Sequence, residues 1–355
     1  MRGIGRWILL ILIGTGIFYL VRIGDFNPDE AVQKVEQKLK TKETEMESKS
    51  TPDHFTSEIG LEGDLYSRIG ESTDDLVDEL GEPLRKDKSS YGYDWWIYTN
   101  DEHQYMQFGV ADGKVVTIFA TGDDLSIDPV SIGQSYEETS SHFDFENEVS
   151  ISEGITSYRF QLTDEEIKVR PLVKLDKQTY MQLYFDTFTE KLSSVRVVTK
   201  DILLKQRPYE IYYRGKLPEK PELTDEEWEE VQNGMEKQIF DITNVIRSRH
   251  DKSTLSWDDP IAEVAFSHSK DMSDNNYFSH YSQNGEGLKE RLSDHEIYYL
   301  SAGENIAAQY TDGPAAVEGW LNSEGHREAL LKDGYTHLGV GVYRYYYTQN
   351  FMQKP

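Results

Sequence analysis

Residues 320–327 read Trp-Leu-Asn-Ser-Glu-Gly-His-Arg, and they close a helix that we predict to begin near Pro314. Two aromatic segments follow at 337–343 and 345–351, and apolar and polar residues alternate in both. Alternation with a period of two is typical of half-buried β-strands. Helices followed by a terminal pair of antiparallel strands predict an α+β domain over residues 235–353.

Three residues of this domain have the chemistry of a functional site. His280 lies in a loop after a helix expected over 261–275, Glu304 lies in what we predict to be a second loop at 302–305, and His326 lies in the octapeptide. Two imidazoles and a carboxylate are suited to bind Zn²⁺ with one position open for water. Without metal they are suited to proton transfer near neutral pH. The alternative is a structural role, in which they only hydrogen-bond across the loops.

The order of short motifs in this domain resembles the CAP superfamily of cysteine-rich secretory proteins, venom allergens and plant pathogenesis-related proteins, in a cysteine-free bacterial form. The matching segments lie at 244–247, 255–258, 268–272, 277–280, 303–307, 320–327, 338–341 and 348–351. The resemblance implies a three-layer α/β/α sandwich around an antiparallel sheet.

The resemblance also implies a cleft lined by two histidines and two acidic residues. His280, Glu304 and His326 match three of these positions, and Ser323 stands where the second acid is expected. Glu324 is adjacent, but one step along a helix turns a side chain by about 100°, so it need not substitute for that acid. We therefore expect a triad, with His280 and His326 as the candidate metal ligands.

The middle region, residues 60–205, contains two similar units at 60–125 and 126–205. Each begins with Ile-Gly-x-Ser, and Ser72 and Ser135 are each followed by acidic residues, which predicts an N-capped helix. Strand-like segments follow at 91–98, 104–110 and 115–120, and again at 157–162, 178–185 and 194–199. We predict two small α+β units, and the region resembles the CAP-associated N-terminal domain. A linker and helix at 206–234 connect it to the CAP domain, with Thr224 as a predicted N-cap.

An apolar segment opens the chain at residues 1–24. Arg2 and Arg6 precede fifteen uncharged residues, 7–21, which is near the lower limit for crossing a bilayer. No pair of small residues suited to cleavage follows, so we predict an uncleaved signal anchor, with a cleaved signal peptide and secretion as the alternative. The positive-inside rule places the rest of the chain outside the cytoplasm. Residues 25–59 are rich in Lys and Glu and predict a charged linker.

Composition excludes some functions of the whole chain. The formal net charge is −27, and such a chain repels nucleic-acid phosphates, so we expect no nucleic-acid partner. Cysteine is absent, which excludes disulfides and thiolate chemistry and limits any metal site to His, carboxylates and water.

Three hypotheses follow for function. The first is a cell-envelope binding module whose CAP cleft holds a lipid, glycan or peptide, with or without a divalent metal. The second is a zinc-dependent hydrolase or peptidase that uses His280, Glu304 and His326. The third is a non-catalytic structural or signalling protein that acts through its N-terminal repeats. The sequence favours the first and does not decide whether the chain is an enzyme, because the second family acid is missing.

Overall fold

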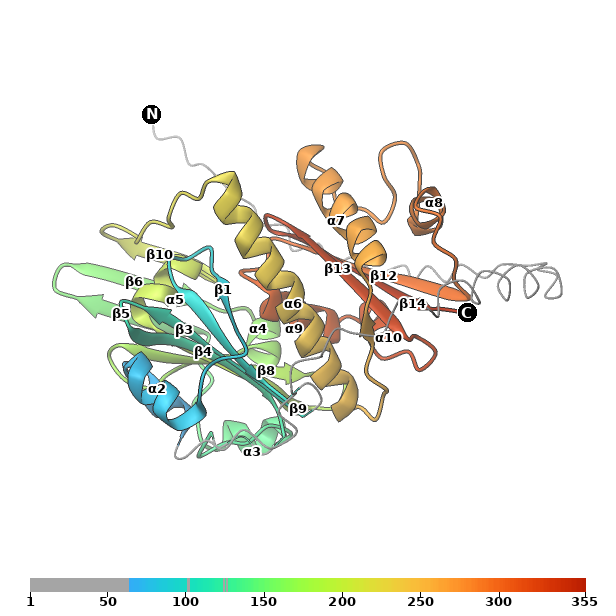
Figure 1. Cartoon of the computed structure of the whole chain (residues 1–355). Helices are drawn as coiled ribbons and strands as arrows, with labels where there is room; N and C mark the ends of the chain where they lie inside the picture. Colours follow the sequence, from blue (N-terminus) through green and yellow to red (C-terminus); the bar gives the residue numbers. More distant parts are fainter. Residues whose placement is uncertain (1–63, 101–102, 124, 126) are drawn as a thin grey trace, which may run out of the picture.

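The computed structural model describes residues 64–355 except 101–102, 124 and 126 (Figure 1). The predicted apolar helix at 1–24 and the predicted charged linker at 25–59 lie outside the described residues. None of the helices in the described ranges combines the length and the apolar character that a bilayer crossing requires.

One seven-stranded antiparallel sheet organises the middle region. Its strand order is β1-β2-β3-β4-β9-β8-β7. The first four strands follow the 3-10 helix η1 and helix α2, and the elements are η1 (Leu65–Arg68), α2 (Thr73–Leu80), β1 (Arg85–Lys88), β2 (Asp94–Thr99), β3 (Gln104–Ala111) and β4 (Lys114–Gly122). The other three strands follow helix α3, and the elements are α3 (Tyr136–Ser140), β7 (Leu172–Lys174), β8 (Thr179–Asp186) and β9 (Lys191–Thr199).

A smaller antiparallel sheet, β10-β6-β5, belongs to the second half of this region. Its strands and the two nearby helices are β5 (Glu148–Glu153), β6 (Thr156–Gln161), α4 (Asp164–Val169), α5 (Lys200–Gln206) and β10 (Glu210–Arg214).

The two sequence units meet by pairing strand β4 of the first with strand β9 of the second, in antiparallel register with Phe119 opposite Arg196. Both predicted N-caps are confirmed, since Ser72 accepts from the backbone N–H of Asp75 and Ser135 from that of Glu138. The units therefore do not fold as separate sheets. The end strand of each unit pairs with that of the other, and this pairing leaves β4 and β9 without free edges.

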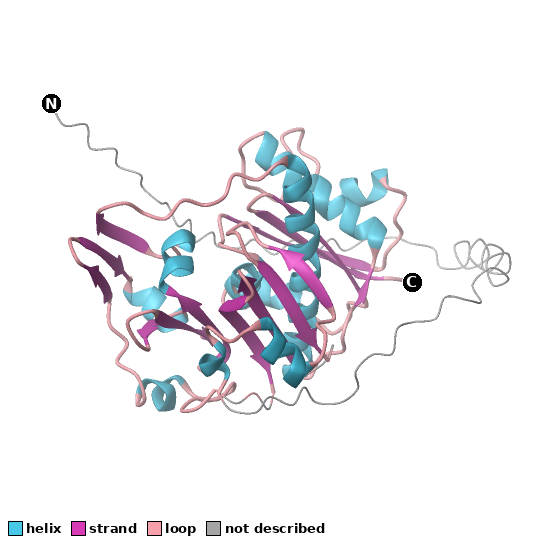
Figure 2. Ribbon diagram, turned by 60° about the vertical axis from the view of Figure 1, so that its left-hand side comes forward, coloured by secondary structure: helices cyan, strands magenta, loops and turns pink. Residues whose placement is uncertain are grey.

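The C-terminal region is a three-layer sandwich, as the sequence predicts. Its sheet has the order β11-β13-β14-β12, with α7 and α8 over one face and α6, α9 and α10 over the other (Figures 1 and 2). The elements are α6 (Asp225–Arg249), β11 (Ser256–Trp257), α7 (Asp259–Asp274), α8 (Leu288–Asp294), β12 (Ser301–Ala308), α9 (Gly313–Leu321), α10 (Glu324–Leu330), β13 (His337–Tyr343) and β14 (Tyr346–Gln353). Strand β12 is the last strand of this sheet, next to β14, so one of its edges is open.

Two glycines of β13 set how closely helix α7 lies on the sheet. A Cβ at Gly341 would lie 1.8 Å from the backbone nitrogen of Phe266, and a Cβ at Gly339 would lie 2.2 Å from that of Ala262. Any side chain on this face would push the helix away, because packed interiors leave no room for extra atoms. The alternate residues of β13, such as Val340, point to the other face and join the core beneath α6.

Helix α6 packs between the two regions and joins them in one core (Figure 1). It begins at Asp225 with a capping box formed by Thr224 and Glu227, as predicted, and runs without a break to Arg249. A single hydrophobic cluster includes Tyr91, Trp95 and Phe119 of the middle region, Ile239 and Ile242 of α6, and Val340 and Phe351 of the C-terminal sheet. Because they share a core, the two regions hold a defined relative position.

Charged and polar groups are also buried at this junction. Arg196 of β9 is fully buried and donates to both carboxylate oxygens of Asp312 at 2.7 and 2.8 Å. Glu318 of α9 is also buried, and its Oε1 accepts from the hydroxyls of Ser193 and Ser194. Burial raises the pKa of Glu318 to about 7, although the two serine hydroxyls and Arg249 act in the opposite direction.

A Glu318→Gln variant is expected to change how stability depends on pH. The folded-state pKa lies above the unfolded value, so Glu318 favours folding below about pH 4.5 and loses this contribution as pH rises through about 7. Glutamine resembles the protonated acid at every pH. The free energy of unfolding of the variant, relative to wild type, should therefore increase by up to about 3 kcal/mol between about pH 4 and pH 8.5. Urea unfolding at both pH values measures this, and a difference that does not change with pH would contradict it.

Candidate functional site

The best-defined polar site lies at the open edge of the C-terminal sheet, around Glu304. Residues 302–305 were predicted to form a loop, but they lie in strand β12, which pairs with β14 along its whole length. Glycine and asparagine are poor strand formers, yet the pairing with a complete neighbouring strand outweighs that preference. The strand geometry turns Glu304 towards α7 and α8, and its side chain is 4% exposed.

Both carboxylate oxygens of Glu304 have close partners. Oε1 accepts from Nδ1 of His280 at 2.9 Å, and Oε2 accepts from the guanidinium of Arg291 at 2.6 Å. Burial raises the pKa of Glu304, but Arg291 and the histidines His280 and His268 outweigh it and lower the pKa to about 2. Glu304 is therefore a carboxylate at neutral pH, and it only accepts hydrogen bonds.

This arrangement fixes the orientation of the His280 ring. Since Glu304 only accepts, Nδ1 of His280 must carry the proton that it donates, and in a neutral ring the lone pair is then on Nε2. Arg291 also donates to the backbone carbonyl of His280 at 3.1 Å, which holds the loop from the other side. The side chain of His280 is 27% exposed, so part of the ring is accessible to solvent.

His326 lies near His280, and the region between their two rings is called the cleft below. It lies on α10, a separate short helix after the predicted helix at 314–323, and the two imidazole ring centroids are 6.5 Å apart. Burial, and then the charge of His280, lower the pKa of His326 to about 4, so its ring is neutral at pH 7. Within the described residues the ring makes no hydrogen bond, whereas the His326 backbone carbonyl accepts from Asn305 at 3.1 Å.

The structure thus brings the three predicted site residues together, but their positions in the site differ. His280 and His326 line the cleft, and Glu304 lies behind His280 as its hydrogen-bond partner. Ser323 precedes α10 as its N-cap residue and makes no side-chain capping hydrogen bond. Glu324, the neighbouring acid, is exposed to solvent.

Sequence reasoning missed Arg291 of this site and did not assign His268 to it. Arg291 comes from α8, and His268 comes from the apolar face of α7, where its Nε2 donates to the Ser279 carbonyl at 3.0 Å and lies 4.0 Å from Glu304 Oε1. Burial lowers the pKa of His268, which leaves it neutral beside the carboxylate. A buried carboxylate needs a cation or several hydrogen-bond donors as partners. No pattern in the sequence indicated that Arg291 would be that partner of Glu304.

The donor set does not match a catalytic zinc site. Such sites usually have three protein ligands and an open position. Here both carboxylate oxygens of Glu304 accept hydrogen bonds from His280 and Arg291. At this site that leaves His280 Nε2 and the His326 ring as candidate metal ligands. Across the described ranges, no cluster of three or more His, Asp or Glu side chains is placed to hold a metal ion. Zinc binding therefore stays a prediction that needs ligands beyond these two histidines.

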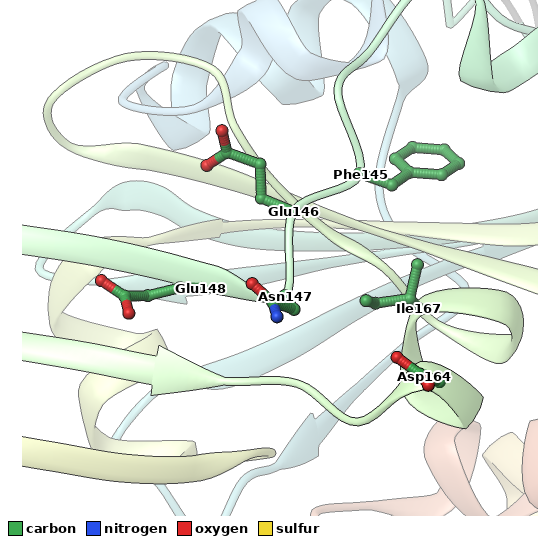
Figure 3. A pocket seen from close by; sticks show the side chains of 6 residues that line it. All are labelled: Phe145, Glu146, Asn147, Glu148, Asp164 and Ile167. Atoms are coloured by element: carbon green, nitrogen blue, oxygen red, sulfur yellow. The ribbon is translucent and has the colours of Figure 1, made fainter.

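Two hollows lie on the described surface, and residues of the site line part of one of them. One, of about 440 Å³, is lined by residues of α7, α8 and the loop between them, including His268 and Arg291. The other, of about 570 Å³, lies in the middle region and includes Glu146, Glu148 and Asp164 (Figure 3). In Figure 3 these three carboxylates point in different directions, so this hollow has no convergent set of ligands for a cation.

Comparisons with known proteins agree with both parts of the fold. Residues 240–354 match the cysteine-rich secretory protein family, and residues 69–209 match the CAP-associated N-terminal family. The membrane protein YlbC of Bacillus subtilis (strain 168) is 51% identical over 290 residues, which cover 82% of this chain and 84% of that protein.

Two solved structures are similar over most of their length. An extracellular protein containing an SCP domain, from Bacillus anthracis str. Ames, has a TM-score of 0.78 and 44% identity, covering 87% of this chain and 99% of that one. A cysteine-rich secretory protein from Staphylococcus aureus subsp. aureus Mu50 has a TM-score of 0.72 and 25% identity, covering 82% of this chain and 96% of that one.

Proposed function

The chain belongs to the cysteine-rich secretory protein (CAP) family, in the form with a CAP-associated N-terminal domain, and on this basis we propose that it is a cell-envelope binding protein whose CAP cleft holds a glycan. The relatives support a location outside the cytoplasm, since YlbC is named a membrane protein and the B. anthracis protein is described as extracellular. The predicted signal anchor at residues 1–24 would hold the domains at the membrane surface.

The observation that carries this proposal is the fixed orientation of His280. Its Nδ1–H is bound to Glu304 at 2.9 Å, and Glu304 is in turn bound to Arg291 at 2.6 Å, so Nε2 keeps one direction in the cleft. In a neutral ring this Nε2 is an acceptor for hydroxyl groups, as are the ring nitrogens of His326, whose lowered pKa leaves it neutral at pH 7. A site of this kind suits a ligand rich in neutral hydroxyl groups better than a phosphate or a carboxylate.

Two aromatic side chains support a sugar ligand further. Phe278 and Tyr281, on the same loop as His280, are 52% and 44% exposed. Aromatic rings give apolar contact area at low entropic cost, and their neighbouring polar groups set the orientation of the ligand. The first hypothesis also allows a peptide or a lipid ligand. The experiment below distinguishes each of them from a glycan.

Zinc-dependent hydrolysis is the second candidate, and one contact favours it. A metal-bound histidine generally donates its other N–H to a carboxylate, as His280 does to Glu304. Glu304 itself is a weak general base, because Arg291 and the histidines outweigh the effect of burial and lower its pKa to about 2. Proton transfer in this cleft would therefore depend on His280, with Glu304 holding its orientation.

The test uses the full chain purified in mild detergent. Wild type is expected to co-sediment with purified cell-wall sacculi, and a His280→Ala/His326→Ala variant is expected to bind at least about tenfold more weakly, because both cleft acceptors are removed. His337→Ala is the matched control, since this CAP-domain histidine lies on β13, beyond β14 from the cleft strand β12. The control should bind as wild type does.

The same preparations separate the other hypotheses. Binding to phosphatidylglycerol vesicles or to stem peptides, but not to glycan strands freed of peptide, would replace the glycan with that ligand. Stoichiometric Zn²⁺ binding in a calorimeter that disappears in the double variant would favour the hydrolase. Sacculus binding that survives in the double variant would overturn the proposed role of the cleft and favour recognition by the N-terminal repeats.

A further inference from the structure

The turn that leads to His326 is bound by the middle region as well as by its own domain. Residues 321–327 run from the last residue of α9 into α10 and include Ser323, the position of the missing family acid. The β8–β9 hairpin, residues 179–199, packs against this turn from outside the CAP domain.

Asn322 joins the turn to the hairpin tip with three hydrogen bonds. Its Oδ1 accepts from the backbone N–H and the hydroxyl of Thr187, both at 2.8 Å, and its Nδ2 donates to the carbonyl of Phe185 at 2.9 Å. An amide with both ends bonded to another segment is fixed in position and orientation.

Arg327 makes the strongest contact between the two segments. Its guanidinium donates to both oxygens of Asp186 at 2.8 and 2.9 Å, and Asp186 has a side-chain exposure of 4%. The guanidinium also lies 4.8 Å from the ring centroid of Phe188. Two-pronged arginine–carboxylate pairs fix geometry as well as adding stability. His326 immediately precedes Arg327, so this pair holds the helix turn from which the His326 side chain extends.

The two sequence units differ at this hairpin. In the first unit two residues, Asp112 and Gly113, connect β3 and β4, whereas four residues, 187–190, connect β8 and β9. Both connections contact the start of the helix in their own unit, since the backbone N–H of Thr73 donates to the Gly113 carbonyl and that of Tyr136 to the Glu190 carbonyl. The longer one extends to the CAP domain, so the contact with α9 and α10 is specific to the second unit.

We propose that the β8–β9 hairpin is a positioning element of the cleft, in which Asp186 and Thr187 hold Arg327 and Asn322 and thereby set the place of His326 opposite His280. Asn305 of β12 holds the His326 backbone from within the CAP domain. Glu318, hydrogen-bonded to Ser193 and Ser194, extends the same contact along α9. Half of the cleft thus depends on the N-terminal region. The proposal takes His326 as a cleft residue and does not depend on which ligand binds there.

The test compares the full chain with an Asp186→Asn/Asn322→Ala variant under conditions where both are folded by circular dichroism. Hydrogen–deuterium exchange of the peptide that covers residues 322–331 is expected to become at least about tenfold faster in the variant. Carbethoxylation of His326 by diethyl pyrocarbonate should become several-fold faster, because the ring is no longer held in its half-buried place. Exchange in β13 and β14 should stay as in wild type. Asp186→Asn alone provides the same two measurements if the double variant does not fold.

Asp241→Asn is the matched control. It disrupts another ion pair across the junction, Asp241 of α6 with Arg85 of β1 at 2.7 Å, which is similarly buried. Strand β1 lies five positions from β8 in the sheet, roughly 24 Å away. The control should leave exchange at 322–331 and labelling of His326 unchanged. Wild-type values in the hairpin variants, or equal acceleration in the control, would overturn the proposal. Neither measurement involves a ligand, so failure of the glycan proposal leaves this result intact.

Discussion

An Arg291→Met variant is expected to lose about 3–5 kcal/mol of unfolding free energy at pH 7. Arg291 donates to Glu304 and to the backbone carbonyls of His280 and Glu286, and its side chain is 9% exposed. Without the guanidinium, Glu304 stays buried with a negative charge that has lost its main counter-ion. Breaking a buried pair in this way costs more than the pair contributed, because the remaining charge has left water without compensation.

The pH dependence gives this prediction a second measure. In wild type the pKa of Glu304 is lowered to about 2, so this group stabilises the fold above about pH 4.5 and loses that contribution as pH falls towards 2. Removing Arg291 should raise the pKa of Glu304. The difference in unfolding free energy between variant and wild type should therefore become smaller at about pH 3.5 than at pH 7.

Lys88→Met is the control for charge removal. Its partner is Asp94, at 2.9 Å, and both side chains are at least 42% exposed. Exposed pairs of this kind contribute about 1 kcal/mol or less. Urea unfolding of the three proteins at both pH values measures the effect. A loss in Arg291→Met no larger than in Lys88→Met would mean that Glu304 has another adequate partner, such as His280.

An Asp312→Ala variant is expected to lose about 4 kcal/mol or more. Asp312 binds the fully buried Arg196 with both oxygens, and its Oδ1 also accepts from the backbone N–H of Ala315 as the N-cap of α9. The variant leaves an arginine cation in the core without its counter-ion and removes the cap. The middle region and the C-terminal region should both lose stability, since Arg196 belongs to β9 and Asp312 precedes α9.

A second variant separates the charge from the cap. In Arg196→Met/Asp312→Asn no buried charge is left unpaired, and asparagine is a good N-cap. We expect this double variant to regain most of the stability lost in Asp312→Ala, because apolar replacement of a complete buried ion pair is often close to neutral. Chemical unfolding followed by tryptophan fluorescence provides the comparison. A double variant less stable than Asp312→Ala would show that the pair contributes net stability beyond avoiding an unpaired charge.

Local patterns in the sequence correctly predicted those structural features that depend only on residues close together in the chain. The N-caps at Ser72, Ser135 and Thr224 are confirmed, because a cap is made by a side chain and a backbone N–H three residues apart. The predicted CAP sandwich is also confirmed. The loop predicted at 302–305 is wrong, because its backbone pairs with a strand nearly fifty residues later in the chain, and local propensity does not report such pairing.

The resemblance in sequence identified the family and placed His280, Glu304 and His326 as the residues to examine, since short motifs keep their order along the chain. The tertiary structure decided what each of them does. Glu304 lies behind His280 because Arg291 of another helix binds it, and His326 faces His280 because its turn is held by Asp186 of the middle region. The contacts of Arg291 and Asp186 join residues that are 13 and 141 positions apart in the chain. Roles of this kind come from charge pairing across packed elements, so they become visible only once the chain has folded.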